Sequence, residues 1–440
     1  MFLDQLPARL LSLTSVRQRQ GSSADRGKML RFPAVHGEPM SFLRRVAPGI
    51  VTGAADVDPA LVLTATVVGA VFGYRLLWVV ALCVPFLLTV FAVSARIGHQ
   101  TRRGLVDLLL HHYGRTVAVA CAAVIVVINM AMLVADLMAV SEALSIVLDQ
   151  RRVFFVAAAA FTVWYILIFR DYHKITHALA FLSLPLFIYV AAAVASNPPV
   201  AEVVRSTFIP SLSGNFAYGS AVLALFGSLL TPYVLVWQTS SRREHAETGQ
   251  AIHSSEHFMG ALVSSVLCFS IIVAAATVLR SAISADSPLT VRMAANALSP
   301  AVGEAGPVLF ALGIIGSGLV ALPILVASLC YSVSEAMGWE SGLSANPWEA
   351  KRFYVLISAS LFIAAALNFF HFDPVTALYG SQILAGILTV PILVFILLLS
   401  NDRRVMRTVN SRLQNFWIGA AAGGLGAAGL LVLAWKLRGY

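Results

Sequence analysis

Charge is the scarcest property of this chain. Only 12% of its 440 residues are Asp, Glu, Lys or Arg, whereas a soluble globular protein has about a quarter. The chain has only four cysteines, no two of them form a CxxC pair, and all fall inside apolar stretches, at Cys83, Cys121, Cys268 and Cys330. These scarcities exclude a soluble enzyme of ordinary composition and a disordered chain, and they predict small core cysteines that form neither disulfides nor metal sites.

Apolar residues take the place of the missing charge. They make up 59% of the chain, and the mean hydropathy is +0.83. The apolar runs are long and continuous, which favours transmembrane helices of about 20 residues over a membrane barrel. We therefore predict an all-α membrane protein with eleven transmembrane segments, at 46–70, 76–95, 117–147, 153–169, 176–195, 216–239, 257–279, 303–336, 353–370, 374–399 and 414–436.

The basic residues that give the chain its net charge of +9 lie mostly between these segments. With the N-terminus in the cytoplasm, the inner tail and loops hold 22 of the 30 lysines and arginines. This bias predicts a multi-pass protein of the cell membrane, with the N-terminus inside and the C-terminus outside. Zinc-finger spacing and aromatic-basic interleaving are both missing, so no nucleic-acid partner is expected.

Two of the segments are interrupted in the middle by a polar residue followed by proline. The first contains Asp58-Pro59 and the sixth contains Thr231-Pro232. Proline cannot donate a backbone hydrogen bond, and a polar residue before it is a typical helix start. We therefore predict that both spans unwind and restart halfway. Two independent proline kinks are the alternative, but they leave two aspartates at mid-membrane, Asp56 and Asp58, unexplained.

The two breaks lie five helices apart, which is the pattern of a transporter built from inverted repeats. Five plus five inverted helices, with the first of each half broken, resemble the LeuT-like arrangement. We expect residues 1–44 to form a cytoplasmic polar tail and residues 45–199 and 200–402 to form the two repeats. Residues 403–440 would then form a loop and the eleventh helix.

The breaks bring oxygen ligands to the middle of the membrane. Unwinding frees backbone carbonyls near Asp56 and Ser228, beside the Asp58 carboxylate and the Thr231 hydroxyl. Oxygen donors favour hard cations such as Mg²⁺, Ca²⁺ or Mn²⁺. Asp56 would bind the ion directly or through water, or would serve in a vestibule or as a cap. Gln382, in the tenth segment, either reaches the ion or packs between helices.

At these positions the chain resembles the NRAMP family of divalent-metal transporters. In that family the DPGN motif of the first helix and the MPHN motif of the sixth hold the ion. Four stretches carry the resemblance: Ala47 to Ile50 followed by Asp58 to Leu61 (GPG…DPGN in the family), Phe72 to Tyr74 with Leu77-Trp78 (FGYxLLW), Ala135 to Leu137 (TDL), and Thr231 to Tyr233 (MPHN).

The differences from the family pattern concern the ligands themselves. Asp58 matches the DPGN aspartate, whereas Leu61 stands in place of its asparagine and Thr231 in place of the MPHN methionine. Tyr233 replaces the histidine that the family links to proton movement, and Ala139 replaces an acid of the third helix. These changes resemble the magnesium transporters related to NRAMP. Three further stretches fit that branch: Ser94 to Gly98, Glu335 to Trp339 and Ser400 to Met406.

The resemblance implies a carrier of divalent cations, Mg²⁺ first and Mn²⁺ second, that works by alternating access. Its candidate metal ligands are Asp58, Thr231, Ser228, Asp56 and Gln382. We expect no cofactor and no protein partner, only the transported ion and the lipid bilayer.

Other functions stay open as alternatives. One is a proton-coupled Mn²⁺/Fe²⁺ symporter, and a weaker one is a sodium-coupled carrier of small solutes. Because the family's histidine and helix-three acid are replaced, we expect transport without proton coupling. Asp136 either lines the cytoplasmic exit path or is paired within the bundle. An enzyme is not expected, since the chain contains neither HExxH nor GxSxG.

Overall fold

The computed structural model describes residues 57–169, 183–248, 254–280, 290–343, 345, 347–370 and 373–437. Every regular element in these ranges is a helix, as the composition predicts. The described residues belong to one unit, which begins at Leu43. The predicted polar tail, Asp56 and the first half of the first segment lie outside the described residues.

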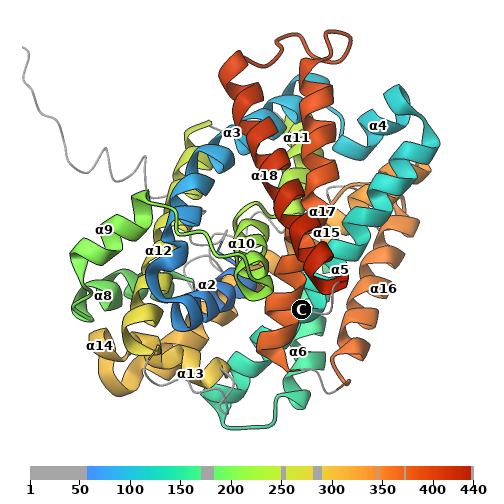
Figure 1. The fold of residues 1–440 in the computed structure, drawn as a ribbon. Coiled ribbons are helices and arrows are strands. Elements are labelled where there is room, and N and C mark those ends of the chain that lie inside the picture. The colour runs from blue at the N-terminus through green and yellow to red at the C-terminus, as the bar shows by residue number, and fades with distance from the viewer. Residues whose placement is uncertain are drawn as a thin grey trace, which may run out of the picture. The chain divides into compact units, whose positions relative to one another are not determined.

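The helices follow the predicted apolar segments closely (Figure 1). In the first half of the chain they are α2 (Pro59–Phe72), η1 (Gly73–Leu76), α3 (Leu77–Thr101), α4 (Leu105–Tyr113), α5 (Arg115–Leu148), α6 (Val153–Phe169), η2 (Leu184–Phe187), α8 (Ile188–Ala195) and α9 (Val200–Phe208). The short 3-10 turn η1 separates the first two segments. It begins at Gly73, whose φ of 63° favours glycine.

The second half of the chain begins with the interrupted sixth segment. Its elements are α10 (Phe216–Leu229), α11 (Pro232–Thr248), α12 (Ser254–Val278), α13 (Val291–Ala295), η3 (Asn296–Leu298), α14 (Ser299–Val302), η4 (Gly303–Ala305), α15 (Gly306–Met337), α16 (Lys351–Leu367), α17 (Pro374–Asn401) and α18 (Arg412–Leu437). Asp373 caps α17, because its side chain accepts a hydrogen bond of 2.8 Å from the Thr376 N–H. The cap and the proline that follows it account for the start of this helix.

The described residues contain seven helical stretches that are long and apolar enough to cross a membrane. The stretch Pro59–Thr101 holds both the first and the second predicted segment. A bent pair, Leu184–Ala195 and Val200–Phe208, meets at 116° and would raise the number to eight if it forms one span. The chain is thus a multi-pass membrane protein, while the count of eleven segments and the division into two repeats stay predictions.

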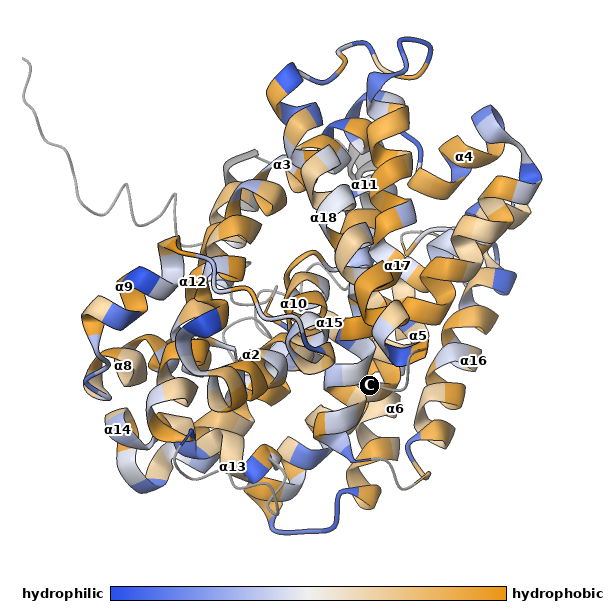
Figure 2. Ribbon diagram, viewed as in Figure 1, coloured by the Kyte–Doolittle hydropathy of each residue, from blue (hydrophilic) through white to orange (hydrophobic). Residues whose placement is uncertain are grey.

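The outer surface suits contact with lipid. Figure 2 shows hydrophobic residues along the helices and the most hydrophilic residues gathered in the loops and at helix ends. Large apolar side chains far from the core are well exposed, among them Phe161 on α6, Phe362 on α16 and Leu430 on α18. A soluble protein would bury such side chains, whereas a bilayer covers them. The four cysteines are buried and free, as predicted.

Close helix packing brings α2, α5 and α15 together. The long helices α5 and α15 contact each other extensively. Gly318 of α15 lies so close to Val140 of α5 and Pro59 of α2 that an added Cβ would come within 3.2 Å of the proline ring. Small residues permit this approach in membrane bundles. The start of α2 is therefore held against the middle of α5 and α15.

Candidate functional site

The sixth segment is broken, as its Thr-Pro pair predicts. The first half, α10, ends at Leu229, and the second half, α11, begins at Pro232. Leu230 leaves the helical conformation, with φ −91° and ψ 57°. Residue i+4 from Ser228 is Pro232, which has no N–H to give to the Ser228 carbonyl. The break therefore leaves that carbonyl oxygen available to another partner.

Asp58 forms the other half of the arrangement. It caps α2, because its Oδ1 accepts a hydrogen bond of 2.7 Å from the Leu61 N–H. Pro59 is the first residue of that helix. The helix start predicted at this position is thus confirmed. The Asp58 side chain is fully buried, so a carboxylate lies at the N-terminus of α2 inside the bundle.

A hydrogen bond joins the start of α2 to the second half of the broken sixth helix. The Tyr233 hydroxyl, in the first turn of α11, donates to Asp58 Oδ2 over 3.2 Å. Tyr233 is almost fully buried as well. The sequence singled out Tyr233 only as the replacement for a histidine, and the contact with Asp58 was not foreseen. Both carboxylate oxygens of Asp58 thus have a donor, one from α2 and one from α11.

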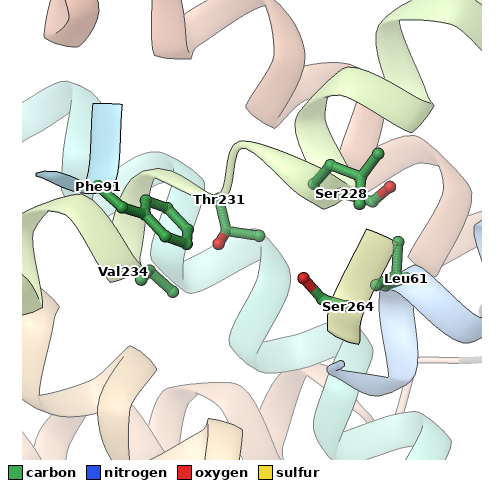
Figure 3. Close-up of a pocket in the computed structure, with 7 residues that line it drawn as sticks. Leu61, Phe91, Ser228, Thr231, Val234 and Ser264 are labelled. Carbon is green, nitrogen blue, oxygen red and sulfur yellow. The ribbon is translucent and has the colours of Figure 1, made fainter. Parts of the chain in front are cut away.

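Beside this pair lies a small cavity with space for about one water-sized sphere. Figure 3 shows the Ser264 hydroxyl turned toward Thr231, with Leu61 and Ser228 on one side and Phe91 and Val234 on the other. The lining residues are Leu61, Phe91, Ser228, Leu229, Thr231, Val234 and Ser264. The structure therefore brings the predicted Thr231 and Ser228 together at one cavity, beside Leu61 of α2.

Ser264 is the lining residue that sequence reasoning missed. It lies on α12, an uninterrupted helix of the seventh segment, and its hydroxyl donates to the Ala261 carbonyl over 3.2 Å. Ser264 lies outside both the Asp-Pro and the Thr-Pro site and is neither an acid nor an amide. A Ser264-Ser265 pair in an apolar span was the only available signal.

Two further buried polar residues lie near the breaks. Gly227 of α10 packs directly on the backbone of Gln382 and Gly386 in α17, which brings Gln382 to the level of the sixth-helix break. Gln382 is fully buried, and neither its amide oxygen nor its nitrogen has a hydrogen-bond partner among the described residues. Such an amide usually bonds to water or a ligand.

Asp136 of α5 is the second buried polar residue near the breaks. Its carboxylate faces the Ala60 N–H in the first turn of α2 and interacts electrostatically with Asp58. It is fully buried, and neither oxygen makes a hydrogen bond of normal geometry within the described part of the chain. Asp136 therefore lies beside Asp58, and no described residue forms an ion pair with it.

The described residues contain no group of three or more histidine, cysteine, aspartate or glutamate side chains that could hold a metal ion. The polar atoms at the breaks are instead carboxylate, hydroxyl, amide and backbone oxygens, with few charges among them. Oxygen ligands of this kind suit hard cations, which accept carbonyls and keep some of their water. Asp56, the remaining predicted ligand, lies outside the described residues.

A helix that starts at a buried aspartate, bonded to a sixth segment that is broken in its middle, is typical of a transporter fold of the LeuT type. Solved structures agree. A mutant of the manganese transporter from Eremococcus coleocola has a TM-score of 0.64 at 17% identity, covering 91% of this chain and 88% of that one. MhsT, solved in complex with L-phenylalanine, has a TM-score of 0.54 at 13% identity, covering 88% and 98%. At these identities the likeness concerns the fold alone.

Within that class the family is defined by sequence. Residues 49–434 match the family described as natural resistance-associated macrophage protein-like, or Nramp. The chain belongs to this family. Its predicted fold class and the resemblance to NRAMP proteins are both confirmed.

Individual members of the family share less than a third of their residues with this chain over the matched regions. The metal transporter NRAT1 of Oryza sativa subsp. japonica is 28% identical over 207 residues, which are 44% of this chain and 36% of that protein. The chain thus spans about a third of the length of that relative. The divalent metal cation transporter MntH of Granulibacter bethesdensis is 23% identical over 387 residues, which are 85% of this chain and 84% of that protein.

Proposed function

We propose that this protein carries divalent metal cations across a membrane by alternating access. The observation that carries the proposal is the fully buried Asp58 carboxylate, which lies where the start of α2 meets the second half of the broken sixth helix. A second buried carboxylate, Asp136, lies beside it, and no described residue forms an ion pair with either. Two neighbouring carboxylates in a membrane need a positive counter-charge, which a divalent cation supplies.

The proposed ligands are Asp58, the Thr231 hydroxyl, the Ser228 carbonyl and the Gln382 amide oxygen, together with Asp56. The cavity geometry supports Thr231 and Ser228, and the unpaired amide supports Gln382. Asp136 would act on the ion through its charge. The relatives named as transporters of metals and of divalent metal cations support the same substrate class.

Mg²⁺ is the proposed first substrate and Mn²⁺ the second, with weak discrimination between them. The methionine that binds the ion in the main family is Thr231 here, so a thioether is replaced by an oxygen ligand. Thioethers favour softer transition metals, whereas hydroxyls and carbonyls do not. The exchange removes one source of preference for manganese.

We further propose that transport is not coupled to protons. The family's sixth-helix histidine is Tyr233, whose reference pKa near 10 makes a phenol a poor proton relay at neutral pH. The helix-three acid is Ala139, and the ninth-helix stretch 355–367 has no charged residue. The ion would move down its own electrochemical gradient. Moving its two charges across a membrane potential of 100 mV corresponds to roughly 4.6 kcal/mol.

The test is uptake of Mg²⁺, Mn²⁺ and Ca²⁺ into proteoliposomes, with a pH dye inside. We expect uptake of Mg²⁺ and Mn²⁺ at similar rates and no metal-dependent acidification. Acidification that scales with metal uptake would replace this proposal with the proton-coupled alternative. A requirement for external Na⁺ and a small organic solute, without metal uptake, would favour the sodium-coupled carrier.

Tyr233 should fix the carboxylate that binds the ion. Tyr233→Phe removes the donor to Asp58 Oδ2, and a hydrogen bond to a charged group contributes enough to raise the apparent KM by about tenfold. The maximal rate should change little, because the charge remains. Uptake measured against ion concentration separates the two quantities.

Tyr218→Phe is the matched control. The Tyr218 hydroxyl accepts a hydrogen bond from Trp78 Nε1 and donates to the Ser211 carbonyl, outside the proposed site. Its loss should leave the KM unchanged. An equal KM for wild type and Tyr233→Phe would show that the hydroxyl has no positioning role.

A further inference from the structure

A third buried acid lies at the end of the bundle that carries α4, the upper end in Figure 1. Glu335 occupies the last turn of α15 and is only 7% exposed. Its Oε2 accepts hydrogen bonds from the backbone N–H groups of Val106, over 3.1 Å, and Asp107, over 3.2 Å. Its Oε1 accepts a hydrogen bond of 2.7 Å from the Ser240 hydroxyl. One carboxylate therefore joins three separate helices.

The positive partner of this carboxylate is a helix end. No described residue forms a salt bridge with Glu335, but Val106 and Asp107 lie in the first turn of α4, where free N–H groups and the helix dipole stabilise a negative charge. Gly104, just before α4, lies against the Glu335 carboxylate, and any Cβ there would overlap it. Glu335 thus caps α4 from another helix.

The third hydrogen-bond donor to Glu335, Ser240, belongs to the second half of the broken sixth helix. Gln238, Thr239 and Ser240 of α11 are polar yet buried. Gly98 of α3 packs on the backbone of the same turn, and an added Cβ would come within 2.9 Å of the Thr239 Cα. This turn of α11 is therefore enclosed by α3 on one side and bonded to Glu335 of α15 on another.

We propose that Glu335 is a gating residue, which holds α11 and α4 on α15 when this end of the transport path is closed. The inference rests on the proposed function, because rocking of the broken helices requires α11 to leave its neighbours. Separation would leave the buried carboxylate without its donors, which is costly until water reaches it. The Glu335 contacts would thus set the population of the state that is open at this end.

A native thiol reports on this region. Cys121 of α5 is 4% exposed and lies close enough to Glu335 for the two groups to interact electrostatically. Cys268 of α12 is fully buried and has no such relation to Glu335. Labelling of both thiols with N-ethylmaleimide, read by peptide mass spectrometry on the full chain in lipid nanodiscs, separates local opening from general loosening.

We expect Glu335→Ala to accelerate labelling of Cys121 by about tenfold, and Glu335→Gln by less, because an amide keeps one acceptor oxygen. Cys268 should react at the wild-type rate in both. The control is Glu304→Gln, which removes a carboxylate from the exposed turn η4 and should change neither thiol. An unchanged Cys121 rate, or a parallel rise at Cys268, would overturn the proposal.

Removal of the Glu335 charge can by itself make the Cys121 thiol more reactive, so Ser240→Ala is the decisive variant. It keeps the carboxylate, removes only the bond to α11 and should still accelerate Cys121 labelling. A wild-type rate in that variant would equally refute the gate. Metal uptake is measured on the same preparations. Failure of the wild type to carry any divalent cation would reject the proposed function. The labelling rates test the role of Glu335 independently of that result.

Discussion

Asp58→Ala should reduce metal uptake to the background of protein-free liposomes. The substitution removes the carboxylate that bonds to both α2 and α11, through Leu61 N–H and Tyr233 OH. Losing one partner of a buried charge pair costs about 3 to 5 kcal/mol, which corresponds to an affinity loss of about a hundredfold or more. Flux assays with Mg²⁺ and Mn²⁺ on the purified variant measure the effect.

Helix capping must be separated from ion binding, because Asp58 performs the first and is proposed to perform the second. Loss of an N-cap alone costs about 1 kcal/mol. Asp58→Asn keeps an amide oxygen for the Leu61 N–H but removes the charge, and it should be as inactive as Asp58→Ala. Asp373→Ala removes an equivalent cap before Pro374, at an exposed helix start, and should retain transport. Wild-type flux in Asp58→Asn would remove Asp58 from the list of ligands.

The positions of the helix starts could be predicted because their causes are local. A proline lacks a donor wherever it stands, and an aspartate before it can cap the helix that follows. The sequence alone therefore placed the starts of α2, α11 and α17 correctly. The order of two broken spans five segments apart was enough to indicate the fold, since few arrangements share it.

The lateral neighbours of the breaks could not be predicted, because they depend on how the helices pack. Ser264 lines the cavity only because α12 packs closely against α2, through contacts such as Gly69 with Ala275. The Tyr233–Asp58 bond likewise needs the first turns of α2 and α11 to meet. Periodicity gives the faces of a helix but not their partners in an all-apolar bundle, where every face is hydrophobic.

Gln382 and Asp136 are intermediate cases. Their polarity inside apolar segments marked them as unusual. The sequence left Gln382 either as an ion ligand or as a packing residue, and Asp136 either on the cytoplasmic exit path or paired within the bundle. The structure shows both buried, with side-chain atoms that make no hydrogen bond within the described ranges. A simple packing role would leave those atoms unsatisfied at a cost of about 1 to 3 kcal/mol each, so contact with water or an ion accounts for these buried polar groups better than packing does.

Thr231→Met should shift the selectivity of uptake toward Mn²⁺. Thr231 lines the cavity between the two breaks, close to Ser264 and Leu61. Replacing its hydroxyl with a thioether removes a hard ligand and adds a soft one, which favours transition metals over alkaline earths. We expect the ratio of Mn²⁺ to Mg²⁺ uptake to rise by about tenfold, equivalent to a difference of about 1.4 kcal/mol between the two ions. Competition between the ions in proteoliposomes gives the ratio directly.

The added bulk must be distinguished from the sulfur, because the cavity has space for only about one water-sized sphere. Thr231→Leu is the matched control, since it has a similar volume without a soft ligand and should reduce uptake of both ions together. If Thr231→Met and Thr231→Leu give the same ratio, residue 231 does not contact the ion. If only the methionine variant favours Mn²⁺, the oxygen at this position is what allows Mg²⁺ to compete in the wild-type protein.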